Sequence, residues 1–120
     1  GGLAYKLLSQ PKGPSPLKIS GFECAGMSEK EVSLLPDVYA RAAKIAKKTG
    51  FTGVQIHAGH GFLLSQFLSP LFNHRKDQYG GSIQARSRIV IEIIEKVRDA
   101  VGGTFPIGIK KKEDYLKTTL

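Results

Sequence analysis

From residue 28 to residue 110 the chain alternates between helix-forming and strand-forming segments. We expect a helix, a strand over Thr52–His57, a long loop, a helix opened by Ser82, and a strand over Phe105–Lys110. Strands that alternate with helices of this length are typical of parallel βαβ packing. The first strand is almost continuously apolar or small, as in a strand covered on both faces. The predicted fold class is therefore α/β.

The two helices carry clear start signals. Ser28 followed by Glu31 has the spacing of a capping box, and Ser82 is a good cap for the second helix. Pro36 lacks a backbone donor, so we expect a short first turn and a main helix over about Asp37–Thr49. Its predicted apolar stripe is Val38, Ala42, Ile45 and Ala46, and that of the second helix is Val90, Ile93, Ile94, Val97 and Val101.

The segments flanking this region have a different character. Residues 1–27 contain Pro11, Pro14 and Pro16 together with several glycines, which predicts a loop region. We expect one domain over residues 28–110 and a divergent tail over residues 111–120. Because the chain does not begin with Met, we interpret it as a fragment or a processed product.

Composition excludes several classes of protein. Cys24 is the one cysteine, which excludes an internal disulfide and a Cys-rich zinc site and favours a reducing compartment, here taken as the cytoplasm. No segment approaches the roughly 18–20 apolar residues that span a bilayer. The net charge of +8 suggests nucleic-acid binding, but the lysines are scattered without interleaved aromatic residues. We therefore expect no membrane, nucleic-acid or metal partner.

Two histidines stand where the first strand ends. His57 and His60 are separated and followed by small residues, which leave room for a ligand at the carboxyl end of the strand. In α/β folds this end of a strand commonly carries the chemistry. The alternative is a structural pair, with each ring hydrogen-bonded to backbone.

The run from Gly50 to Arg88 resembles the old yellow enzyme family, the NADH:flavin oxidoreductase group of FMN-dependent ene-reductases. The matching motifs are His-Ala-Gly-His at 57–60, Gln-Phe-Leu-Ser-Pro at 66–70 and Asn-His-Arg-Lys-Asp-Gln-Tyr-Gly-Gly-Ser at 73–82. A weaker likeness extends over Ser28–Lys110. The resemblance implies a TIM (β/α)8 barrel that holds FMN, takes hydride from NAD(P)H, and reduces the activated C=C bond of small enone-like alkenes. The chain would supply about two βα units of that barrel.

The resemblance also implies roles for individual residues. His57 and His60 would donate hydrogen bonds to the substrate carbonyl oxygen, and Lys110 would be the cation beside the flavin pyrimidine ring; the alternative for Lys110 is a surface lysine. Phe62 stands where the family carries a proton-donating tyrosine, and it has no hydroxyl to give. We expect Arg75, Asp77 and the Tyr79-Gly80-Gly81 turn to hold the loop together rather than to touch substrate.

Length limits what these residues can form alone. A TIM barrel takes about 250 residues, whereas this chain has 120. We expect the open edges of an incomplete sheet to allow self-association, and FMN binding by the chain alone to be weak or absent. The alternative function is a catalytically inactive remnant or interaction module that binds no flavin on its own.

Overall fold

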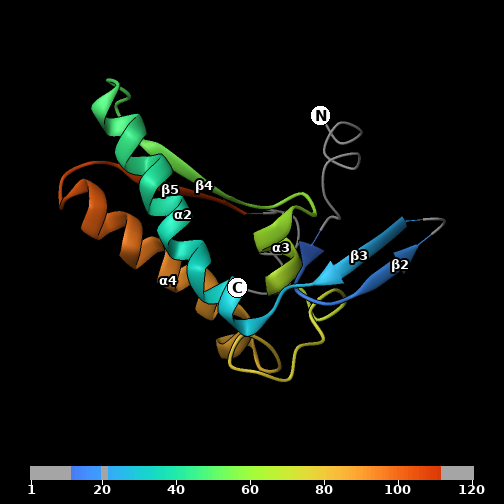
Figure 1. The fold of residues 1–120 in the computed structure, drawn as a ribbon. Coiled ribbons are helices and arrows are strands. Elements are labelled where there is room, and N and C mark those ends of the chain that lie inside the picture. The colour runs from blue at the N-terminus through green and yellow to red at the C-terminus, as the bar shows by residue number, and fades with distance from the viewer. Residues whose placement is uncertain (1–11, 20–21, 112–120) are drawn as a thin grey trace.

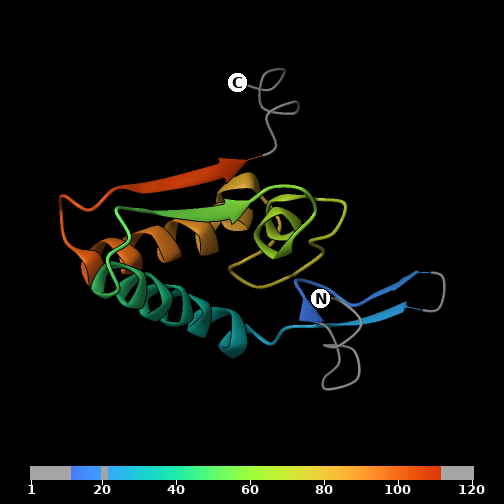
Figure 2. The same cartoon turned by 90° about the horizontal axis from the view of Figure 1, so that it is seen from above.

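The computed structural model describes residues 12–19 and 22–111. Its central unit is a pair of parallel strands, β4 (Val54–Ala58) and β5 (Ile107–Lys111). Helix α2 (Glu29–Lys48) precedes β4, while α3 (Leu63–Leu68) and α4 (Ile83–Val101) connect β4 to β5. Figures 1 and 2 show α2 and α4 side by side on one face of this two-stranded sheet. The α/β class and the parallel pairing are as predicted.

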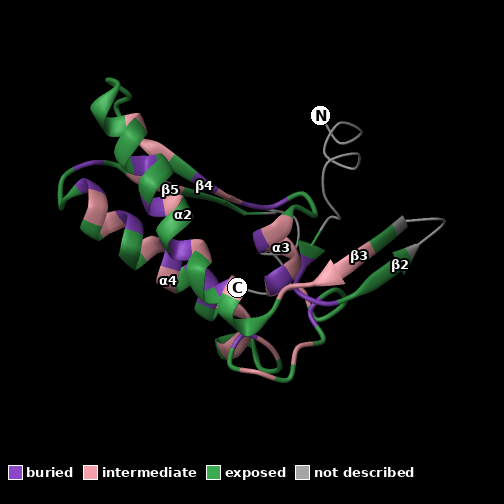
Figure 3. Ribbon diagram, in the orientation of Figure 1, coloured by how far each residue is buried: buried purple, intermediate pink, exposed green. Residues whose placement is uncertain are grey.

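The core lies between the two helices and the sheet. Helix α4 contributes the residues expected of it, since Val90, Ile93, Val97 and Val101 are buried and Ile94 is partly buried. The largest fully buried side chains are Tyr79, Phe67 and Leu64, which come from α3 and the loop after it. The purple segments in Figure 3 follow these inward faces. The long loop is therefore packed structure that belongs to the core.

Helix α2 differs from the prediction because it runs through Pro36 without a break. A proline inside a helix removes one hydrogen bond and costs about 3 kcal/mol. Here the ring is buried with Val32, Ala40 and Ala43, and this packing, together with the capping box between Ser28 and Glu31, offsets that loss.

The predicted apolar stripe of this helix is also wrong. Val38 is 49% exposed and Ile45 is 63% exposed, and Ala42 is exposed as well, while Ala46 is half-buried. The prediction followed apolar spacing within a helix that was assumed to start after Pro36. The true face is set by the earlier start of the helix and by small residues that pack closely on α4.

The prediction of a loop over residues 1–27 is wrong for the part that the structure describes. Strands β1 (Lys12–Gly13) and β2 (Leu17–Ile19) both pair with β3 (Phe22–Gly26), β1 in parallel and β2 antiparallel. Pro14 and Pro16 occupy the connection between β1 and β2, so they mark a turn rather than the absence of strands. Figure 2 shows the β2–β3 hairpin projecting away from the helices. Residues 1–11 lie outside the described part.

Strand β5 ends one residue beyond the end of the strand that the sequence predicted. Lys111, expected to begin a divergent tail, is the last residue of β5, and residues 112–120 lie outside the described part. No helix among the described residues is long and apolar enough to cross a membrane.

Candidate active site at the carboxyl end of strand β4

Three aromatic side chains gather where β4 ends. The rings of His57 and His60 stack with centroids 5.5 Å apart and planes 28° apart. The ring of Phe62 lies 4.9 Å from that of His57. His60 has a φ of 57°, an uncommon value for a residue with a side chain. The tight turn after β4 therefore brings the second histidine back toward the first.

A hydrogen bond from helix α3 holds this turn. Gln66 Nε2 donates to the carbonyl oxygen of Gly61 at 2.8 Å. Gly61 has a φ of 74°, which only glycine adopts without cost, and Phe62 N donates to the carbonyl of Gly59. The Gln-Phe-Leu-Ser-Pro motif thus contributes a side chain that fixes the backbone between His60 and Phe62.

Lys110 lies beside the first histidine on the neighbouring strand. His57 and Lys110 are register partners, and such partners lie about 4.8 Å apart and point to the same face of a parallel sheet. That face is the one turned away from α2 and α4, since Ile56 and Ala58 are the buried residues of β4. Lys110 and His60 are exposed, and His57 is half-buried. The structure therefore brings His57, His60, Phe62 and Lys110 to one end of one sheet face.

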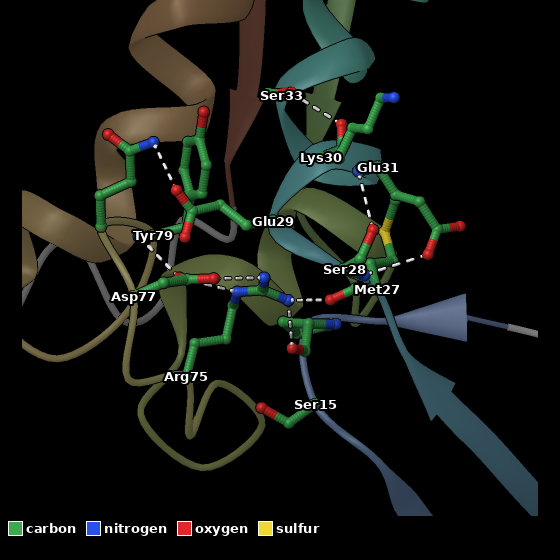
Figure 4. A network of polar contacts seen from close by, with 12 residues as sticks. Ser15, Met27, Ser28, Glu29, Lys30, Glu31, Ser33, Arg75, Asp77 and Tyr79 are labelled. Carbon is green, nitrogen blue, oxygen red and sulfur yellow. Dashed lines mark hydrogen bonds and ion pairs between the residues drawn. The ribbon is translucent and has the colours of Figure 1, made fainter.

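The loop after α3 is fastened by Arg75, as Figure 4 shows. Its guanidinium makes a bidentate pair with Asp77, with Nε–Oδ1 at 3.0 Å and Nη2–Oδ2 at 2.5 Å. Nη1 also donates to the carbonyl oxygens of Pro14 at 2.8 Å and Met27 at 2.6 Å. The expected contact between Arg75 and Asp77 is confirmed, and the two bonds to the N-terminal strands add a role that the sequence did not predict.

The charge of this arginine changes the titration of its partner. The hydrogen bonds from Arg75 hold the pKa of the Asp77 carboxyl below its usual value, against a smaller opposing effect of burial. Asp77 therefore stays ionised and also accepts a hydrogen bond from Tyr79 N.

Two further residues of the same loop have structural roles: Asn73, which sequence reasoning missed, and Tyr79, which was expected to belong to a turn that holds the loop together. Asn73 is buried, and its Nδ2 donates to the carbonyls of Phe67 and Tyr79. Tyr79 is 2% exposed, and its hydroxyl donates to Glu92 at 2.8 Å. Burial, followed by this hydrogen bond, raises the pKa of Tyr79 to about 12. For Asn73, the signal available in the sequence was its place at the start of the Asn-His-Arg-Lys-Asp-Gln-Tyr-Gly-Gly-Ser motif.

The side chains at the strand end fit a flavin and a carbonyl substrate in their donor chemistry. The two histidine rings lie next to each other at this strand end, and each imidazole has a ring nitrogen that can donate a hydrogen bond. Lys110 is exposed on the same open sheet face as His57. Its ammonium is therefore free to lie beside the electron-rich ring of a flavin. Among residues 12–19 and 22–111, no cluster of three His, Cys, Asp or Glu side chains could hold a metal ion.

Comparison with known proteins identifies the family. The model of the NADH:flavin oxidoreductase / NADH oxidase family matches residues 8–113. A metal reductase of Desulforamulus reducens is 44% identical over 97 residues, covering 81% of this chain and 14% of that protein. An NADH-dependent flavin oxidoreductase of Talaromyces variabilis is 49% identical over 83 residues, 69% of this chain and 20% of that protein.

Solved structures agree with the sequence relatives. Morphinone reductase in complex with tetrahydroNAD is 32% identical with a TM-score of 0.79, over 86% of this chain and 33% of that one. The old yellow enzyme homologue from Zymomonas mobilis is 32% identical with a TM-score of 0.77, over 84% of this chain and 32% of that one. This chain therefore spans about a third or less of the length of the relatives named here. From its matched length and its architecture, the chain belongs to the NADH:flavin oxidoreductase / NADH oxidase family and forms part of a TIM barrel of the old yellow enzyme type.

Proposed function

We propose that this chain supplies the substrate-binding strand of an FMN-dependent NAD(P)H oxidoreductase that reduces activated C=C bonds of small enone-like molecules. The observation that carries the proposal is the stacked pair His57 and His60 at the carboxyl end of β4, with Lys110 in register beside it. A relative named cinnamate reductase, 40% identical over 93 residues, acts on an alkene conjugated to a carboxyl group according to its name. Bound FMN would supply the hydride, which it receives from NAD(P)H.

The histidines bind and polarise the substrate. Hydride addition to an enone builds negative charge on the carbonyl oxygen, and donors already in place stabilise that charge as it forms. A hydrogen bond to a charged acceptor contributes about 1.5–3 kcal/mol, which is roughly tenfold to a hundredfold in rate. The Gln66 bond to Gly61 keeps the turn in position, so the second imidazole need not be reoriented for each turnover.

Lys110 would hold the flavin and favour its reduced form. Its ammonium lies on the open sheet face beside His57, and a positive charge near the flavin pyrimidine ring stabilises negative charge there.

The lone cysteine, Cys24, is a free thiol. A free thiol accords with a reducing compartment, and we place the protein in the cytoplasm.

Phe62 alters the last step of the reaction. Its ring packs 4.9 Å from His57 but carries no hydroxyl, so Phe62 cannot donate the proton that the substrate α-carbon takes up. General acid catalysis is worth about 10²–10⁴-fold. We therefore expect slow alkene reduction and a less affected transfer of hydride into the flavin.

The test replaces both histidines in the longer protein that contains this chain. His57→Ala with His60→Ala should raise the dissociation constant of a phenol, which mimics the oxyanion, at least tenfold when followed by its charge-transfer absorbance with oxidised flavin. The rate of flavin reduction by NAD(P)H should change less than threefold. As a matched control, His74→Ala removes an exposed imidazole outside the site and should change neither quantity. Equal phenol affinity in the double variant and the parent would refute the assignment.

A second candidate function rests on the two-stranded sheet. β4 and β5 pair only with each other among the described residues, so each presents an unpaired edge. Such edges recruit further strands, and the isolated chain would then act as an interaction module that self-associates without flavin. Titrating the purified 120-residue chain with FMN distinguishes a flavin-binding chain from one that self-associates without flavin. Stoichiometric flavin binding by a monomer in sedimentation analysis would exclude this second candidate.

A further inference from the structure

Helix α2 presents an apolar stripe on the face opposite its buried side. Leu34 is 50% exposed, Val38 is 49% exposed and Ile45 is 63% exposed. At about 100° per residue, these three side chains fall within about 40° of one another and point roughly 180° away from the buried face. Figure 3 shows exposed residues along the length of this helix. The stripe therefore contributes nothing to the core of this chain.

The stripe is also distinct from the two flanks of α2, which border a cavity and helix α4. One flank carries a cavity of about 160 Å³ lined by residues of α2, β4 and α4, among them Tyr39, Ala43 and Val54. The opposite flank faces α4, where Asp37 pairs with Lys96 at 3.5 Å. Leu34, Val38 and Ile45 lie between these two flanks, on the outer side of the helix.

The spacing of the stripe is that of a helix–helix seam. Positions 34, 38, 41 and 45 are separated by four, three and four residues, the heptad spacing of a and d positions. Arg41 is the one polar member of the series. A seam this narrow suits a single partner helix, whereas helices that lie on membranes have a broad apolar face.

The charges around the seam select the partner. Lys30, Arg41, Lys44 and Lys48 are exposed, and within the described residues none of them forms an ion pair. Two acidic side chains of the same helix are already paired, Glu31 with Lys12 at 2.5 Å and Asp37 with Lys96. The rim is therefore basic, and it would repel a second copy of the same surface.

We propose that the seam Leu34–Val38–Arg41–Ile45 of α2 is a docking site for an acidic amphipathic helix. The partner would place aliphatic side chains at heptad spacing into the seam and carboxylates along its edges. Burial of aliphatic side chains provides the affinity, and the basic rim provides the specificity and the charge steering. This surface lies apart from the carboxyl end of β4, so the proposal does not rest on the proposed oxidoreductase function.

The test uses the 120-residue chain and a fluorescein-labelled three-heptad peptide with leucine at a and d and glutamate at e and g. Fluorescence anisotropy should show saturable binding that weakens as salt rises. A peptide with lysine in place of each glutamate should bind at least tenfold more weakly. Leu34→Ser with Val38→Ser should weaken binding of the acidic peptide at least tenfold. The matched control is Ile83→Ser with Ile91→Ser on α4, where exposure is 54% and 50%, and it should change affinity less than twofold.

Three results would overturn the proposal. The first is equal peptide binding by the seam variant and the parent, with circular dichroism showing the same helix content in both. The second is a dimer in sedimentation analysis that the seam variant abolishes while neither form binds peptide, which would assign the seam to a second copy. The third is binding to phosphatidylserine vesicles that depends on the seam, again without peptide binding, which would assign it to a lipid surface.

Discussion

Removal of the Arg75 side chain should destabilise the whole domain and free the N-terminal strands. The side chain is 7% exposed and that of Asp77 is 21% exposed, so the ion pair is largely shielded from water. Arg75→Ala would leave the carboxylate without its cation and the carbonyls of Pro14 and Met27 without their donor. The ties between the loop after α3 and strands β1 and β3 would be lost with it.

The structure sets the size of this effect. Breaking a buried ion pair by removing one partner costs about 3–5 kcal/mol, because the remaining charge is left unpaired. Since Asp77 retains some contact with water, we expect the lower end, about 3 kcal/mol. The double variant Arg75→Ala with Asp77→Ala should cost less than the sum of the single changes, since no unpaired carboxylate remains.

Urea unfolding followed by circular dichroism at 222 nm measures these differences. Lys18→Ala is the matched control, because its ion pair with Glu23 is exposed, with side chains 78% and 62% accessible. Exposed pairs contribute about 0–1 kcal/mol. Limited proteolysis should also cut the Arg75→Ala chain earlier within residues 12–27. A loss for Arg75→Ala no larger than that for Lys18→Ala would refute the reasoning.

Three other changes have outcomes set by the structure. Because the pKa of Tyr79 is raised to about 12, the folded state keeps a proton that the unfolded state loses near pH 10, so stability should fall as pH rises from about 10 through about 12. Tyr79→Phe should remove this alkaline loss, measured as urea midpoints across that range. Gly80→Ala would place a Cβ 2.5 Å from the carbonyl oxygen of Arg75 and should cost about 1–3 kcal/mol in urea unfolding, whereas Gly103→Ala meets nothing within 4 Å and should be nearly neutral. Phe62→Tyr in the longer protein should speed alkene reduction about 10²–10⁴-fold in stopped-flow measurements, because it restores a general acid beside the histidines. An unchanged rate would show that the missing hydroxyl does not limit alkene reduction in the parent.

The sequence predicted the elements whose local and tertiary signals agree. In α4 the cap at Ser82, the apolar spacing from Val90 to Val101 and the glycine at residue 102 all indicate one helix, and the structure has it over Ile83–Val101. In α2 the signals conflict, because Pro36 opposes a helix that its neighbours favour. Burial of the ring decides the outcome, and burial depends on tertiary contacts that the local sequence does not contain.

The N-terminal strands escaped prediction for a related reason. β1 has two residues and β2 has three, too few for a period of two to be recognised, and prolines stand between them. Their stability comes from β3 and from Arg75, which lies 48 residues beyond Met27 in the chain. A contact between segments so far apart leaves no trace in the residues around either one.

The structure also explains why the likeness to the family is so specific in this part of the chain. Three residues of the motif from His57 to Ser82 have clear structural roles: Gln66 holds the turn, Asn73 joins two loop carbonyls, and Arg75 fastens the N-terminal segment. Each makes hydrogen bonds that no other side chain could reproduce without rearranging the loop. Phe62 is different, because its ring is 61% exposed and none of its side-chain atoms takes part in a hydrogen bond. A tyrosine hydroxyl can therefore be absent here without cost to the fold. The motif therefore holds the shape of the strand end, and the Phe62 side chain lies outside the hydrogen bonds that do so.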